Sequence, residues 1–282
     1  MTSTTTFPLE KLTYEMQQRL IELATPNEAY RLQQIAPEIA AFQKRKLNVT
    51  HQSKSVWIVG TDTNDIDFLN GVFGQIPYGD EDVIVCDGVV QLDKLTDAHL
   101  KHAVFNHVYL KPEKVMTDGT NFGPAMLELL AEHDMSQAKG LHIDFEDDVD
   151  YAKLLALFPN VDHFGVLGKV DLSWISKIRV NRAIDVIEVT ALGEDLPKCS
   201  AKDVLTLFEN QEDLFYVLLT IYDDEIDSEV TRNQDGFTKY QTYFDELLKD
   251  HFYLDEDEEG VGGKRLIVNY FHYWRSLNYV LK

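Results

Sequence analysis

Carboxylate side chains are the groups in this sequence best placed to do chemistry, because they gather in three dense clusters. The clusters are Asp144, Glu146, Asp147, Asp148 and Asp150; Asp223, Asp224, Glu225, Asp227 and Glu229; and residues 255–259. Like charges a few ångströms apart concentrate a negative potential, which attracts a basic segment of a protein target. The alternative is a solvated rim that keeps the protein soluble.

Patterns for metal and phosphate binding are incomplete. Residues 255–260 match the start of an EF-hand loop, but Leu266 stands where its bidentate glutamate belongs. The run "GVGGKR" lacks the first glycine and the final Ser or Thr of a phosphate loop. Three nearby histidines do not share one helical face and lack a fourth ligand: His99, His102 and His107. We predict no metal ligand, no cofactor and no catalytic residue.

Composition narrows the classes of partner. The 282 residues carry 26 Lys and Arg against 48 Asp and Glu, a net charge of −22, which repels nucleic acid and anionic membranes. No stretch approaches ~18 apolar residues, and the N-terminus lacks the basic and apolar regions of a signal peptide. The two distant cysteines, Cys86 and Cys199, favour a reducing compartment. We expect a cytoplasmic protein, and a nuclear location is compatible with these features.

These side chains must be positioned by a fold, and its first part is helical. The stretch "FPLEKLTYEMQQRLIELATPNEAYRLQQI" begins with apolar residues at intervals of 4, 4 and 3, which predicts an amphipathic helix with Thr13 as its N-cap. The stripe consists of Leu12, Met16, Leu20 and Leu23. Three helices in about 40 residues, as predicted here, bury too little surface to be stable alone. Such a unit usually packs either on a partner chain or, as a plain N-terminal helical cap, on the larger domain.

A second helix is predicted from its start signals. Thr25 and Glu28 have the spacing of a capping box, and Pro26 occupies the first helical position. Leu32 and Ile35 continue the apolar face. Because proline rarely lies inside a helix, Pro37 is expected to begin a third short helix that extends to about Lys46.

The body of the chain alternates short apolar runs with helical patterns. The predicted strands are 56–60, 82–86, 141–145, 163–167, 186–190, 214–222 and 265–274; the predicted helices are 65–73, 122–133, 148–158, 171–181, 200–210 and 238–252. The strand starts at 141, 163 and 186 are 22 and 23 residues apart, a period typical of a strand–helix solenoid of leucine-rich-repeat type. The fold class is α/β: a three-helix module followed by an irregular solenoid, with a compact α/β layer fold as the rival.

The N-terminal stretch resembles the F-box of nematode-type F-box proteins, which binds the Skp-type adaptor of cullin ubiquitin ligases. The opening Phe7-Pro8-Leu9 with Leu12 resembles the family's "FPLxxLP", and Met16, Leu20, Pro26, Glu28 and Leu32 fall on the helical positions. Thr13, Ala24 and Ala29 depart from the family's proline and leucines. Residues 90–282 resemble, in the order of their segments, the FTH-type substrate-binding region, for example in "AKGLHIDF" and "LFPNVDHFGV".

The resemblance implies a non-catalytic substrate receptor that links a Skp-type adaptor, and through it a cullin, to a protein target, with basic segments favoured. It implies a tail at 1–6, an F-box-like module at 7–48 and a target-binding domain at 55–282. The expected adaptor contacts are Phe7, Pro8, Leu12, Met16, Leu20, Leu23, Pro26, Leu32 and Ile35. The expected target contacts are Asp144, Glu146, Asp147, Asp148, Asp223, Asp224 and Glu225.

Two other functions stay open at the level of sequence. One is a protein-binding scaffold or antagonist with no ubiquitin role, in which Thr13, Ala24 and Ala29 reflect a lost adaptor contact. The other is a metal-dependent hydrolase that uses the acidic rim at residues 144–148.

Overall fold

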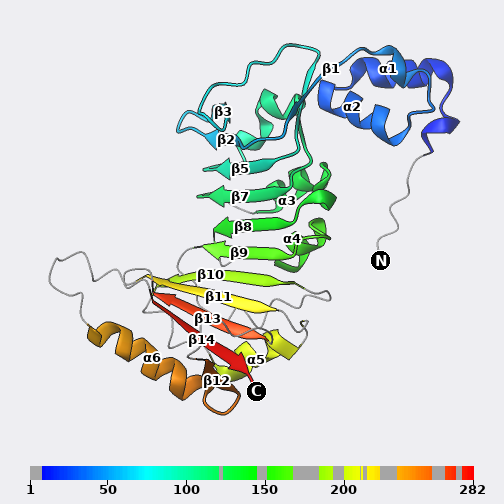
Figure 1. Cartoon of the computed structure of the whole chain (residues 1–282). Coiled ribbons are helices and arrows are strands. Elements are labelled where there is room, and N and C mark those ends of the chain that lie inside the picture. The colour runs from blue at the N-terminus through cyan, green and yellow to red at the C-terminus, as the bar shows by residue number, and fades with distance from the viewer. Residues whose placement is uncertain are drawn as a thin grey trace.

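The described part of the chain starts with two short helices and continues as strands that join one after another into a long sheet (Figure 1). The computed structural model describes residues 8–120, 123–144, 151–167, 184–192, 200–209, 211, 215–222, 234–255, 264–270 and 275–282. Among these residues the class is mixed α/β, with a large, mostly parallel sheet and few helices. None of the described helices is both long and apolar enough to cross a bilayer.

The two N-terminal helices start where the sequence predicts. A short 3₁₀ turn, η1 (Leu9–Lys11), precedes α1 (Tyr14–Leu23) and α2 (Pro26–Ile35). The Thr13 hydroxyl accepts a hydrogen bond from the Met16 N–H at 3.4 Å, which caps α1. The Thr25 N–H donates to the Glu28 carboxylate at 2.7 Å, and the Glu28 N–H donates to the Thr25 hydroxyl at 3.3 Å. Both halves of the predicted capping box are therefore confirmed.

The predicted third helix from Pro37 to Lys46 is wrong. The chain there forms turns and one 3₁₀ turn, η2 (Phe42–Lys44). Ile39, Ala41 and Phe42 are all buried, a spacing that one face of a helix cannot satisfy, because residues two apart point to different sides. The Gln33 side chain donates to the carbonyl oxygens of Phe42 and Arg45 at 2.9 Å each, which replaces helical hydrogen bonds in this segment.

The N-terminal segment has a small hydrophobic core separate from the main one. Its buried members are Ile21, Ala29, Ala36, Ile39, Ala41 and Phe42. The Asn27 amide, buried, donates to the carbonyl oxygen of Phe105 at 3.2 Å and so joins α2 to the body of the protein. A second link is the ion pair between Arg45 and Glu81, at 2.9 Å.

The main sheet has eleven strands among the described residues. In spatial order they are β12 (Phe252–Asp255), β14 (Arg275–Leu281), β13 (Arg265–Tyr270), β11 (Tyr216–Tyr222), β10 (Val186–Leu192), β9 (His163–Leu167), β8 (Gly140–Asp144), β7 (Lys114–Asp118), β5 (Val89–Asp93), β2 (Val56–Gly60) and β3 (Ile66–Asn70). Neighbours from β2 to β13 are parallel, while β3, β14 and β12 add antiparallel pairs at the two ends. Figure 1 shows β5 to β9 stacked in one row and pointing the same way.

A smaller parallel sheet adjoins the start of the row. It contains β1 (Asn48–Gln52), β4 (Asp82–Cys86) and β6 (Val108–Leu110). Each of these strands passes through a short corner into the next strand of the main sheet. Gly88 lies in one such corner, where an added Cβ would be 2.5 Å from the carbonyl oxygen of Ser53. Only glycine permits the two corners to stack so closely.

The predicted helix from Asp65 is also wrong, because residues 66–70 form β3, which pairs antiparallel with β2. A turn reverses the chain before it: Asn64 has a φ of 59°, and the Thr61 N–H donates to the carbonyl oxygen of Asp65 at 3.0 Å. Phe68, buried, then packs into the main core. The turn chemistry decides between strand and helix here, since the apolar spacing fits both.

Four further α-helices lie among the described residues: α3 (Pro124–Ala131), α4 (Tyr151–Leu157), α5 (Ala201–Glu209) and α6 (Gln234–Leu248). All four fall within predicted helices or overlap them. Short 3₁₀ turns complete the set: η3 (His99–Lys101), η4 (Ala103–Asn106) and η5 (Met135–Gln137). The predicted helix at 171–181 lies outside the described residues.

Alternate residues of the central strands face the helices and form the main core. Leu141, Ile143, Phe164, Val166, Ile187 and Val189 are buried there with Met126, Leu130 and Leu154 of α3 and α4. Because successive side chains of a strand point to opposite faces, the residues between them lie on the other face of the sheet. We call this the open face. His142, His163 and Glu188 lie on it.

Candidate functional site

The helix pair carries exposed apolar side chains where the sequence predicts a partner surface. Met16 is 56% exposed, Leu20 36%, Leu23 66% and Ile35 70%. The side chain of α1 that enters the small core is Ile21. The apolar stripe of α1 therefore lies mainly on its outward side.

A groove runs between α1 and α2 with a volume of about 430 Å³. Leu20, Leu23, Leu32 and Ile35 line it together with Ala24, Glu28 and Arg31. We call it the helix-pair groove. It is formed by four of the nine predicted adaptor contacts, which the fold brings to one surface.

The other predicted contacts are distributed differently. Met16 and Pro8 are exposed, and Leu12 is half-buried. Pro26 is buried within this chain, so it supports the start of α2 and does not present itself to a partner. Phe7 lies outside the described residues.

Asp144 is the described member of the predicted acidic rim, at the C-terminal end of β8. Its carboxylate accepts a hydrogen bond from the Gly119 N–H. Burial raises the pKa of Asp144, the Gly119 bond opposes this rise, and the charge of Asp118 adds to it. The remaining predicted target contacts lie outside the described residues: Glu146, Asp147, Asp148, Asp223, Asp224 and Glu225.

Two more aspartates, distant from the acidic clusters in the sequence, lie beside Asp144 at the ends of the neighbouring strands. Asp93 and Asp118 are register partners at the ends of β5 and β7. Asp93 is buried, and burial raises its pKa. A hydrogen bond from Gln91 lowers this pKa, and the negative charges of Asp118 and Asp144 raise it further. The three aspartates follow one another across adjacent strands and are about one repeat apart in sequence. This repeat period is the signal that could have found them.

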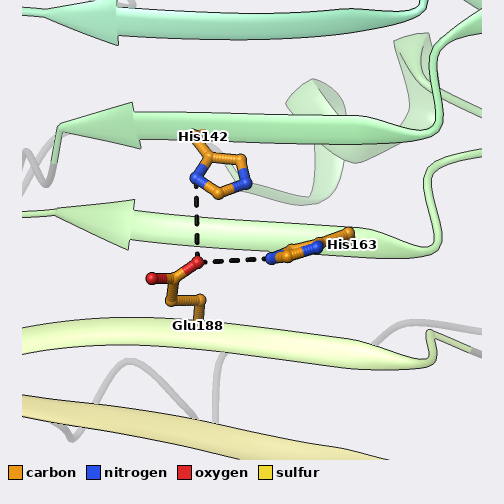
Figure 2. Close-up of side chains that lie close together, drawn as sticks. All are labelled: His142, His163 and Glu188. Atoms are coloured by element: carbon orange, nitrogen blue, oxygen red, sulfur yellow. Dashed lines mark hydrogen bonds and ion pairs between the residues drawn. The ribbon is translucent and has the colours of Figure 1, made fainter.

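A second cluster lies on the open face, at the centre of the sheet (Figure 2). His142, His163 and Glu188 come from three adjacent strands, β8, β9 and β10. The Glu188 Oε2 atom is 3.3 Å from the Nε2 of His163 and 3.9 Å from the Nδ1 of His142. The two imidazole rings lie 4.8 Å apart between centroids.

Gly165 makes this convergence possible. It lies between His142 and Glu188 in the register of the three strands. A Cβ at this position would be 2.7 Å from the Nδ1 of His142, a contact that real side chains do not make. The absence of a side chain lets the His142 ring extend across β9 toward Glu188.

The surroundings of His142 keep its imidazole neutral. Burial lowers the pKa of His142 to about 4; the positive charges of Lys114 and His163 act in the same direction, and Glu188 opposes them. Its Nε2 atom is buried and has no hydrogen-bond partner among the described residues. A neutral imidazole offers a lone pair, which is the form that binds metal ions.

The histidines that lie near one another in the sequence have other partners and do not join this cluster. His99 bonds to Thr96 and to the carbonyl oxygen of Thr61, and His102 pairs with Asp65. His107 contacts the carbonyl oxygen of Asp82. The three open-face residues are 21 and 25 residues apart along the chain, so only strand register brings them together.

Comparison with known proteins gives no family for the chain. No protein-family model, no curated protein and no solved structure matches it.

Proposed function

We propose that the protein is a non-catalytic substrate receptor of a Skp–cullin–F-box ubiquitin ligase, which binds the Skp-type adaptor through the helix-pair groove. The observation that carries this proposal is the groove itself. Four predicted adaptor contacts line it, and the apolar stripe of α1 points away from the chain's own core.

The energetics of the groove favour a protein partner. Burial of a Leu or Ile side chain stabilises a complex by about 1.5–3 kcal/mol when the side chain passes from water to an apolar environment. Leu23 is 66% exposed and Ile35 70%. Most of the free energy of their burial would therefore be gained only when a partner covers them. Glu28 and Arg31 at the groove provide the polar margin that such apolar centres normally have.

The main sheet supports the second half of the proposal. Strands β5, β7, β8, β9 and β10 begin at intervals of 23 to 26 residues and lie side by side in chain order. This arrangement is typical of a strand–helix solenoid of leucine-rich-repeat type, whose parallel strands form a binding surface. A target held there, with the adaptor on the helix pair, would be kept at a high effective concentration near a ubiquitin-charged enzyme.

Co-expression with a Skp-type adaptor tests the proposal. The wild-type chain is expected to co-purify with the adaptor. The double variant Leu23→Asp with Ile35→Asp should lose the adaptor, because it places two charges in the groove. Both side chains are exposed, so the variant should fold, which unchanged far-ultraviolet circular dichroism would verify.

A matched control comes from another exposed apolar pair. Val72 is 83% exposed and Phe73 62%, on the turn after β3. Val72→Asp with Phe73→Asp makes the same change in charge, and should leave adaptor binding unchanged. A wild-type chain that binds no Skp-type adaptor, or equal loss in both double variants, would refute the proposed role of the groove.

A further inference from the structure

We infer that His142, His163 and Glu188 form a binding site for a divalent transition-metal ion of the zinc class on the open face of the sheet (Figure 2). The inference is independent of adaptor binding. It rests on the positions of three donor atoms: Nδ1 of His142, Nε2 of His163 and Oε2 of Glu188.

The distances are close to those of a metal centre. A tetrahedral ion with bonds of about 2.0–2.1 Å holds its ligand atoms about 3.3 Å apart. The His163 and Glu188 atoms are 3.3 Å apart, and the His142 and Glu188 atoms are 3.9 Å apart. All three donor atoms lie within 4.8 Å of one another. To bind the ion, the His142 ring must move closer to the other two donor atoms, which are already 3.3 Å apart.

The donor set selects the kind of ion. Two imidazole nitrogens and one carboxylate oxygen suit Zn²⁺ and its neighbours among the divalent transition metals. Ca²⁺ and Mg²⁺ prefer six or more oxygen ligands, including water. Three protein ligands would leave one position of a tetrahedral ion for water.

A hydrogen bond joins His163 and Glu188 at 3.3 Å, but hydrogen bonding does not account for the position of His142. At 3.9 Å, the Nδ1 of His142 is too far from Glu188 for a hydrogen bond. A metal ion would use the His142 lone pair and the Glu188 charge together.

Lys114 is the charge that opposes a cation here. Its side chain extends over Gly140, where an added Cβ would lie 2.9 Å from the Lys114 Cγ. Gly140 is in turn the register partner of His163. Removal of this positive charge should therefore tighten metal binding, a result that loss of fold could not imitate.

Calorimetric titration of the purified full-length chain with Zn²⁺ tests the site. The visible absorption spectrum of the Co²⁺-bound chain reports the geometry of the site. One ion per chain is expected at this site, with the intense visible bands of tetrahedral Co²⁺. Glu188→Gln and His163→Gln should each weaken binding at least about 100-fold. Lys114→Gln should strengthen it several-fold.

His51→Gln is the matched control, because His51 also pairs with a carboxylate, Asp87 at 2.8 Å, but stands apart from the cluster. Binding in this variant should equal that of the wild type. The inference is overturned if the wild type binds no ion with this stoichiometry, or if Glu188→Gln and His163→Gln bind as the wild type does while their circular dichroism is unchanged. Adaptor binding should be the same in all these variants, so the two proposals can fail separately.

Discussion

Truncation of Phe42 should unfold the N-terminal segment while the main sheet stays folded. Phe42 is fully buried and is the largest side chain of the small core. Phe→Ala changes in cores destabilise by about 3–5 kcal/mol through lost burial and the cavity left behind. Whole domains are stable by only about 5–15 kcal/mol, so a core of six buried residues cannot absorb this loss.

Amide hydrogen exchange followed by mass spectrometry measures the effect by segment. In Phe42→Ala, peptides from α1 and α2 should lose most of their protection, whereas peptides from β7 to β9 should exchange as in the wild type. The helices also contact the body through the hydrogen bond of Asn27 to Phe105, the ion pairs Arg45–Glu81 and Arg31–Glu132, and the ring contact of Tyr30 with Tyr109. These contacts are too few to hold the helices without their core.

Phe73→Ala provides the control, because Phe73 is 62% exposed and its ring contacts that of Trp57, far from the small core. It should change exchange only locally. If Phe42→Ala raised exchange equally in the helices and in the central strands, the helix pair would belong to one cooperative unit with the sheet. If it changed neither, the small core would contribute little stability. Either result would refute the reasoning.

Two further predictions concern pH and packing. Burial lowers the pKa of His133 to about 3, from 6.5 in the unfolded chain. Below pH ~6.5 the unfolded chain therefore binds a proton that the folded chain does not. As the pH falls from ~6.5 to ~3, this residue should lower the free energy of unfolding by up to about 1.4 kcal/mol per pH unit. His133→Asn, which keeps an acceptor near the Leu110 N–H, should flatten that dependence in urea titrations at pH 7, 6 and 5, and equal slopes would contradict the assignment. Gly88→Ala should lower the free energy of unfolding by about 1–3 kcal/mol in the same assay, because its Cβ would meet the backbone of Ser53. Gly79→Ala is the control, because its Cβ would lie 3.4 Å from the nearest side-chain atom, and it should lower the free energy of unfolding much less. Equal losses would show that the corner tolerates a side chain.

Local chemistry made the helix starts and most strands predictable. The hydroxyls of Thr13 and Thr25 cap the helices at the predicted positions, because capping depends on residues three apart in sequence. The strands at Val56, Asp82, His163 and Val186 begin where predicted, since each strand of a buried parallel sheet is a short apolar run of its own.

The errors arose where distant contacts decide local structure. Residues 37–46 have apolar spacing compatible with a helix, yet burial of Ile39, Ala41 and Phe42 on several sides of the segment requires turns. Residues 66–70 became a strand because the turn at Asn64 returns them to β2. Neither the partner strand nor the shape of the small core can be derived from the segment itself.

The candidate sites divide in the same way. The helix-pair groove was largely predictable, because Leu20, Leu23, Leu32 and Ile35 lie on helices whose faces follow from a 3.6-residue period. The open-face cluster of His142, His163 and Glu188 was not. Its formation depends on the register of three strands and on the missing side chain of Gly165, which periodicity along one element does not reveal.

The central claim, that the helix-pair groove binds a Skp-type adaptor, is tested most directly by calorimetric titration of the purified chain with the purified adaptor. We expect saturable one-to-one binding that weakens at least about 100-fold in the double variant Leu23→Asp with Ile35→Asp, since two apolar contacts of about 1.5–3 kcal/mol each are lost. The control Val72→Asp with Phe73→Asp should bind as the wild type does. No binding by the wild type, or equal affinity in the groove variant, would contradict the account.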